Sequence, residues 1–154
     1  MYEITQSYLD VSGNAWGIYS NVDTGVLQIP SGTKTIMPFA NSDFWIADLG
    51  MEFFHWPGQK ILKKEFRRQC ACMVLESTNP NPSTNGYSRV VSWIDEESYG
   101  IVQAEAYDFN NKLLKEFAPK SFKKVNGQWE LQEMEIRNVQ TGSRTRIEFD
   151  LKKQ

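Results

Sequence analysis

The chain has 154 residues, of which 40% are hydrophobic and 13% aromatic, a composition that suits one compact domain over residues 1–154. The 17 Lys and Arg against 19 Asp and Glu leave a net charge of -2, so the chain has no broad attraction for phosphate backbones and nucleic acid is not an expected partner. No apolar run approaches the roughly 20 residues of a bilayer-spanning helix, so we do not expect a membrane-spanning protein.

Turn-forming residues recur along the chain and divide it into short segments. Several have the Asn-Gly or Asn-Asn chemistry that two-residue hairpin loops favour, because these residues tolerate positive φ. The signals fall at residues 23–25, 30–32, 85–86, 110–111, 126–127 and 141–142. This spacing predicts a mainly β fold, built as a meander of antiparallel hairpins.

The first expected elements are short strands over residues 17–19, 26–29 and 34–37. The strand rhythm then breaks at residues 48–57, where Leu49, Phe53 and Trp56 recur at helical spacing. Asp48 can cap such a helix and Pro57 would end it. We therefore expect one short apolar helix over about residues 46–56.

Strands dominate the remaining two thirds of the chain. We expect them over residues 59–68, 70–77, 87–94, 101–107 and 113–125, with 79–86 as an exposed loop. Trp129 and Leu131 alternate in phase, whereas Met134 and Ile136 resume one residue late, which predicts a bulge near Gln132 or Glu133. The last strand, residues 144–151, alternates apolar and charged side chains as a half-buried strand does.

The residues that could carry catalysis or bind metal are few. His55 is the only histidine and lies in the aromatic helix, and no Gly-x-Ser-x-Gly elbow accompanies it. Cys70 and Cys72 should share one face of a strand without bridging, and their spacing matches no zinc site. The glycines are scattered singly and form no phosphate loop. We expect no catalytic residue, metal or cofactor; a hydrolase that uses His55 is the enzymatic alternative.

Aromatic side chains exceed what one side of a small sheet needs. A curved antiparallel sheet with one helix across its concave side can leave an apolar cleft, because so few elements cannot fill the wide end of an open barrel. The helix would then act as a lid. From aromatic content alone, the expected ligand-binding residues of this cleft are Trp45, Phe53, Phe54, Trp56, Trp93, Tyr107 and Trp129.

One stretch resembles a known family. Residues 38–44 read Pro-Phe-Ala-Asn-Ser-Asp-Phe and are followed by Asp48-Leu49, which is similar to the Pro-Phe-x-Gly-Ser-Asp-Phe and Asp-Leu pattern of the bacterial outer-membrane lipoprotein-sorting family. Asn41 replaces the glycine. Similar segments follow at residues 72–77, 87–95, 112–115 and 134–142, so the resemblance covers about residues 15–152.

The resemblance implies a lipoprotein-carrier-like protein of the periplasm or cell envelope. In such carriers an unclosed β-barrel with a helical lid shields lipid acyl chains from water, which implies a non-enzymatic role in lipoprotein sorting or transport. Family members are usually longer at the N-terminus and have a signal peptide there. Met1 to Ile4 lack signal-peptide character, so the chain is expected to hold only part of the barrel.

A partial barrel leaves a second interpretation open. Its exposed sheet edge and wider apolar concavity could recognise a protein or peptide by strand addition, as an envelope sensor would. The same face could also form a homodimer. Lipid or lipoprotein acyl chains remain the first expected partner, and an envelope protein the second.

Overall fold

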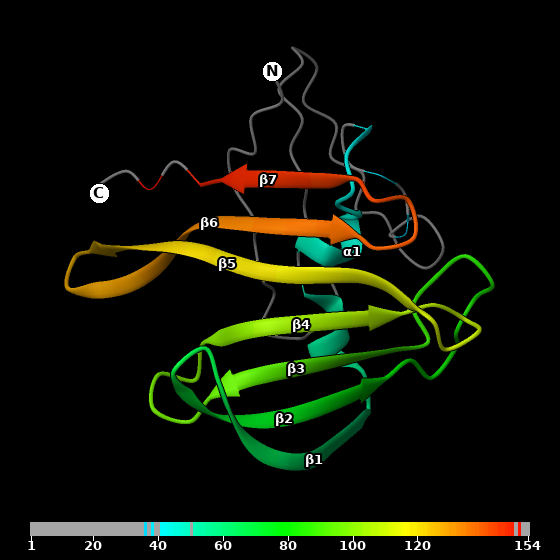
Figure 1. Ribbon diagram of the computed structural model, residues 1–154, viewed down its shortest axis with the longest axis horizontal. Helices are drawn as coiled ribbons and strands as arrows, with labels where there is room; N and C mark the ends of the chain where they lie inside the picture. Colours follow the sequence, from blue (N-terminus) through cyan, green and yellow to red (C-terminus); the bar gives the residue numbers. More distant parts are fainter. Residues whose placement is uncertain (1–35, 37, 39–40, 50, 150, 152–154) are drawn as a thin grey trace.

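The computed structural model describes residues 36, 38, 41–49, 51–149 and 151, and its main feature is one seven-stranded sheet in which each strand pairs with its neighbours in the chain (Figure 1). All pairs are antiparallel. The strands are β1 Gly58–Arg67, β2 Cys70–Thr78, β3 Arg89–Asp95, β4 Ile101–Tyr107, β5 Leu113–Val125, β6 Gln128–Asn138 and β7 Arg144–Glu148. The sheet is not closed, since β1 and β7 do not pair. This confirms the unclosed antiparallel meander.

Local turn chemistry sets most of the hairpins. Asn126 and Gly127, between β5 and β6, both have positive φ, at 49° and 84°, as a two-residue type I′ turn requires. Asn111 and Gly142 also have positive φ at the turns that the sequence predicts. The expected strands at residues 17–19 and 26–29, and nearly all of 34–37, lie outside the described residues.

The turn between β1 and β2 lacks the Asn, Asp and Gly residues that two-residue hairpin turns favour. Arg68 and Gln69 have φ of 48° and 66°, although a side chain with a Cβ is disfavoured there by about 1–2 kcal/mol per residue. The double substitution Arg68→Asn/Gln69→Gly installs the favoured turn pair and is therefore expected to stabilise the protein by about 1 kcal/mol. Thermal unfolding would show a melting temperature higher by about 2–4 °C; an unchanged or lower value would contradict the assigned turn.

The two faces of the sheet carry separate apolar clusters. We call residues 42–49 and 51–56 the lid segment and the face of the sheet that they cover the lid face. The buried side chains of the lid face include Val90, Ala104, Phe117 and Ile136. The opposite, outer face holds a smaller cluster of Cys72, Val74, Val91 and Trp93. Period-two alternation separates the two sets along β3. Cys70 and Cys72 share the outer face as free thiols, as their spacing predicts.

The lid segment differs in detail from the single predicted helix. It contains two short helical segments, α1 Ile46–Leu49 and the 3₁₀ turn η3 Glu52–His55. Met51 separates them, because its φ of 49° and ψ of 45° are left-handed. Figure 1 shows both segments on one side of the sheet. Asp48 lies inside α1 and its carboxylate accepts from the Trp45 N–H at 2.7 Å, so it stabilises the start of α1 and not of a longer helix.

The sheet splits along part of the β4–β5 pair. Pairing runs from Tyr107–Leu113 to Ala104–Phe117 and stops there, whereas β5 continues alongside β6 to Val125. Pro119, two residues past the last paired position, has no N–H to donate to a neighbouring strand. The ladder between β5 and β6 is also irregular there, with Lys120 and Gln132 as extra residues. The predicted bulge near Gln132 or Glu133 is thus confirmed.

Across the described residues, no helix has the length and apolarity needed to cross a membrane.

Candidate functional site

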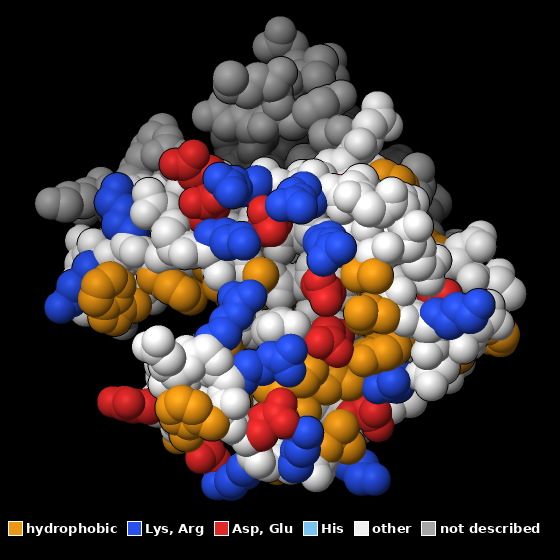
Figure 2. Space-filling view, in the orientation of Figure 1, with side chains coloured by type: hydrophobic (Ala, Val, Ile, Leu, Met, Phe, Trp, Pro, Cys, Tyr) orange, Lys and Arg blue, Asp and Glu red, His pale blue; other side chains and the backbone are white. Residues whose placement is uncertain are grey.

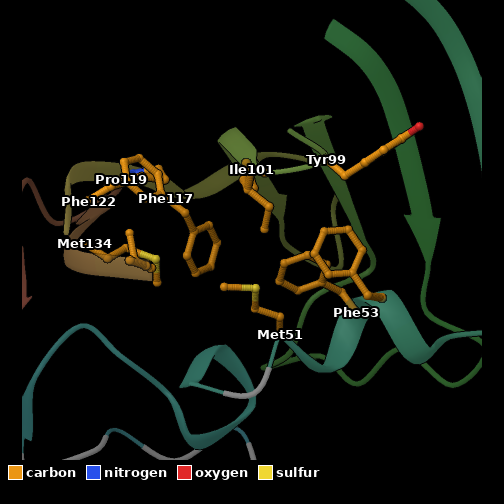
Figure 3. A pocket seen from close by; sticks show the side chains of 12 residues that line it. Met51, Phe53, Tyr99, Ile101, Phe117, Pro119, Phe122 and Met134 are labelled. Atoms are coloured by element: carbon orange, nitrogen blue, oxygen red, sulfur yellow. The ribbon is translucent and has the colours of Figure 1, made fainter. Parts of the chain in front are cut away.

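The cavity of interest lies where β4 and β5 separate, beneath the lid segment. Its volume is about 320 Å³. Figure 3 shows Met51, from the lid segment, and Phe117, from β5, pointing into the space from opposite sides. The described residues that line it are Met51, Phe53, Phe54, Tyr99, Gly100, Ile101, Ala104, Phe117, Pro119, Phe122, Leu131 and Met134.

The lining is chemically uniform. Among these residues none has a charged side chain, and the Tyr99 phenol supplies the one polar side-chain group. Phe53 is buried and packs near Phe54 and Phe117, with ring centroids 4.6 and 6.1 Å away. Such a surface can exclude water and hold an apolar group. It offers no nucleophile, and an ion placed there would lose its hydration without a partner.

A buried ion pair fixes the lid segment to the sheet. The Asp48 carboxylate, from α1, accepts from the Lys115 ammonium at 3.1 Å and from the Tyr87 hydroxyl at 2.6 Å. The Lys115 side chain is 1% exposed and that of Asp48 is fully buried. Lys115 Nζ also lies 3.5 Å from the centroid of the Trp45 ring, which stacks on Tyr87. Cation–π attraction and the ion pair therefore act on the same ammonium group.

The surroundings shift the pKa values of Asp48, Lys115 and Tyr87. Burial raises the pKa of Asp48, although the nearby Lys115 charge opposes that rise. Burial likewise lowers the pKa of Lys115, with Asp48 opposing. The pKa of Tyr87 lies well above its usual value, because burial and the Asp48 charge both disfavour the phenolate. Desolvation is thus the leading cost of this pair, as in other buried ion pairs.

A second anchor of the lid segment, Asp43, lies before Asp48 in the chain. The Asp43 carboxylate accepts from Ser143 at 2.5 Å and from Thr145 at 2.9 Å, at the start of β7. Its backbone N–H donates to Thr145 Oγ1 at 3.0 Å. Phe44, between the two anchors, is fully buried. Asp43 and Asp48, which both lie in the stretch that resembles the family motif, therefore hold the lid segment at two points.

The structure places the seven sequence-predicted site residues in different surroundings. Phe53 and Phe54 line the cavity. Trp45 and Trp56 pack against the lid-face cluster, beside the cavity and not among its lining residues. Trp129 is on β6 and is 71% exposed.

Trp93 and Tyr107 belong to the outer face. The Trp93 ring lies under the Arg67 guanidinium at 3.9 Å, and its indole N–H donates to the Glu65 carboxylate. Tyr107 lies under Arg89 at 3.7 Å. Both rings therefore cover the side of the sheet away from the cavity. Figure 2 shows the outer face, where Lys, Arg, Asp and Glu surround a patch of apolar side chains.

Sequence reasoning missed most of the lining. Ile101, Ala104, Leu131 and Met134 are aliphatic and carry no signal that separates a cavity wall from ordinary core. The position of Pro119 inside an expected strand was the one available signal, because proline marks strand edges and interrupted ladders.

The candidates for other chemistry lie on different elements. His55 is exposed in η3, in the lid segment, whereas Cys70 and Cys72 belong to β2 and to the outer-face cluster. Burial raises the pKa of the Cys72 thiol, with Cys70 a further cause, so the thiol is poorly ionised at neutral pH. Across the described part of the chain, no group of three or more His, Cys, Asp or Glu side chains could hold a metal ion.

Comparisons with known proteins agree with the fold that the motifs predict. The model of one family, described as an uncharacterized protein, matches residues 5–153. No curated protein matches the sequence. A crystal structure of a putative outer membrane lipoprotein-sorting protein domain from Vibrio parahaemolyticus is similar, with a TM-score of 0.68 and 24% identity over 85% of this chain and 60% of that chain.

Two further solved structures share the fold. A DUF1329 family protein from Desulfovibrio piger has a TM-score of 0.70 and 22% identity, over 87% of this chain and 56% of that one. A LolA superfamily protein from Nitrosomonas europaea has a TM-score of 0.62 and 17% identity, over 90% and 64%. The chain thus spans less than two thirds of each of these proteins, and its fold is that of the lipoprotein-sorting domains.

Proposed function

The chain belongs to the family whose model matches residues 5–153, and from this premise we propose that it is a non-enzymatic cell-envelope protein that binds one acyl chain of a lipid or lipoprotein. The observation that carries the proposal is the cavity of about 320 Å³, whose described lining has no charged side chain. Binding would be driven by apolar burial, at about 25 cal/mol per Å².

The size of the cavity favours a single chain. Ligand pockets range from about 300 to 1,000 Å³, and this one lies at the small end. A ligand with a charged or strongly polar body would lose hydration without gaining a partner inside it. A hydrocarbon chain has no such cost, and its polar head would remain in solvent at the open side.

We propose lipoprotein sorting as the biological role of this acyl-chain binding. It is supported by the fold shared with the lipoprotein-sorting domain from Vibrio parahaemolyticus and by the two anchors that the family motif forms. The same likeness supports a place in the periplasm or cell envelope. Residues 1–154 are proposed to act as one lipoprotein-carrier-like domain.

Peptide recognition by strand addition is the less favoured alternative. Among the described strands β1 has one partner, β2, so its other edge is the natural place for an added strand. That strand carries Lys60, Lys63 and Lys64, however, and all three are exposed. Lysines on an edge strand are a common means of preventing strand addition.

The first test is a native mass spectrum of the protein purified from a bacterial host, with extraction of co-purifying lipid. We expect one fatty acid or phospholipid per chain, or uptake of one molecule of a fluorescent fatty acid after delipidation. An empty monomer that takes up no probe would contradict the proposal. An empty dimer, or capture of a defined peptide at β1, would favour the interaction module instead.

A further inference from the structure

Exposed aromatic side chains gather at one end of the sheet. In an antiparallel meander every second connection lies at the same end, so the β1–β2, β3–β4 and β5–β6 turns are together (Figure 1). The large aromatic side chains on or beside these turns are Phe66, 75% exposed, Tyr99, 78%, Trp129, 71%, and Phe122, 50%. We call these four residues, with the turn cations Arg68, Lys123 and Lys124, the hairpin end.

This exposure is unusual, because most of the other described aromatic side chains are buried or half-buried. Among the residues that the structure describes, the other exposed aromatic side chain is Phe109, at the β4–β5 turn of the opposite end, at 48%. Aromatic rings left in water are costly, and here they lie on three separate hairpins. Trp and Tyr, with an apolar body and a polar tip, are also the residues that proteins place at a membrane–water interface.

We propose that the hairpin end docks on a phospholipid bilayer, with its aromatic rings inserted at the headgroup level. This inference goes beyond acyl-chain binding, and it does not require the cavity to be occupied. Separate rings on neighbouring hairpin tips suit a soft lipid surface, into which each can enter independently.

Charge does not oppose this partner. Among the described residues Arg68, Lys123 and Lys124 form no ion pair, and Asp95, Glu97 and Glu130 are the acids without an ion pair at the same turns. These unpaired charges balance, whereas the whole chain has a net charge of -2. An anionic bilayer would therefore repel this end less than the rest of the chain.

The cavity opens beside the proposed docking surface. Tyr99 and Phe122 line the cavity and are also exposed at the hairpin end. Figure 3 shows them on opposite sides of the lining, one from the β3–β4 turn and one from β5. A chain leaving the bilayer at this point would reach the cavity without crossing bulk water.

The test is flotation of the full chain with vesicles of phosphatidylethanolamine and phosphatidylglycerol. The double variant Phe66→Ser/Trp129→Ser removes two exposed rings that do not line the cavity, and Phe109→Ser is the matched control at the opposite end. We expect vesicle partitioning to fall about tenfold or more in the double variant and to stay unchanged in the control. Equal melting temperatures would establish that all three proteins are folded.

Four outcomes would overturn the proposal. These are no vesicle binding by the unmodified protein, equal losses in both variants, binding abolished by salt regardless of the rings, and self-association through Trp129 without vesicle binding. Uptake of a fluorescent fatty acid, measured on the same proteins, separates the two proposals. A protein that docks but takes up no probe would contradict acyl binding alone, and one that takes up the probe without docking would contradict docking alone.

Discussion

Replacing Lys115 with Met is expected to lower the free energy of unfolding by about 3–5 kcal/mol, because it leaves the Asp48 carboxylate buried without its partner. Both side chains are almost completely buried, so solvent cannot replace the lost ammonium group. Chemical denaturation followed by circular dichroism measures the change. A loss below about 1 kcal/mol would show that the ion pair does not fix the lid segment.

The reciprocal variant separates the pair from its surroundings. Asp48→Asn alone should also destabilise strongly, because it leaves Lys115 charged and buried. In the double variant Asp48→Asn/Lys115→Met neither charge remains, so its cost should be smaller than the sum of the single costs by about 1–3 kcal/mol. Simple additivity would contradict a direct interaction between the two side chains.

The same variant predicts a pH dependence of known sign. Lys115 is the main group that opposes the raised pKa of Asp48, so Lys115→Met should raise that pKa further. The folded state then holds the Asp48 proton more tightly than the unfolded state, whose carboxyl has a pKa of about 3.9. The contribution of Asp48 to stability is therefore greatest below that value and falls as pH rises through the folded pKa. Lys115→Met should be more stable at pH 5 than at pH 8, and the opposite trend would contradict a buried Asp48.

Phe54→Asp is expected to raise the dissociation constant for an acyl chain about 100-fold or more. Phe54 lines the cavity, and a carboxylate there would have to lose water when the chain enters, at a cost of several kcal/mol. Phe54 is half-buried and the buried Phe53 beside it is left intact, so the variant should fold. Titration with a fluorescent fatty acid measures the effect.

A matched control uses the same chemistry elsewhere. Phe109→Asp introduces the same charge at an exposed ring at the far end of the sheet and should leave the dissociation constant unchanged. Trp93→Phe, on the outer face, should also leave the dissociation constant unchanged, because the Trp93 ring packs away from the cavity. Equal losses of binding in Phe54→Asp and Phe109→Asp would show that the probe does not report on the cavity.

The sheet could be predicted because its signals are local. Turn residues such as Asn126-Gly127 set two-residue hairpins, and the phase break between Leu131 and Met134 marked the bulge at Gln132. The helix over residues 46–56 was harder, because helical spacing of apolar residues says nothing about a left-handed residue such as Met51. Tertiary contacts of the Asp48 carboxylate, made with Lys115 of β5 and with Tyr87, override the local preference there.

The site could be predicted only in part, because aromatic content does not distinguish the two faces of a sheet. Trp93 and Phe117 are both aromatic residues inside predicted strands. The Trp93 ring nevertheless lies under Arg67 on the outer face, whereas Phe117 lies in the cavity wall. The cavity depends on where β4 and β5 separate, and that is a property of pairing between strands. Pro119 alone pointed to it from the sequence.

The most direct test of the central claim is photo-crosslinking with a fatty acid that carries a diazirine near its methyl end. Mass spectrometry of the digested protein then locates the attached chain. The account predicts labelling of cavity-lining residues in the lid segment and in β6, namely Met51, Phe53, Phe54, Leu131 and Met134, and competition by unlabelled fatty acid. Labelling confined to the outer face, or labelling that unlabelled fatty acid does not reduce, would contradict it.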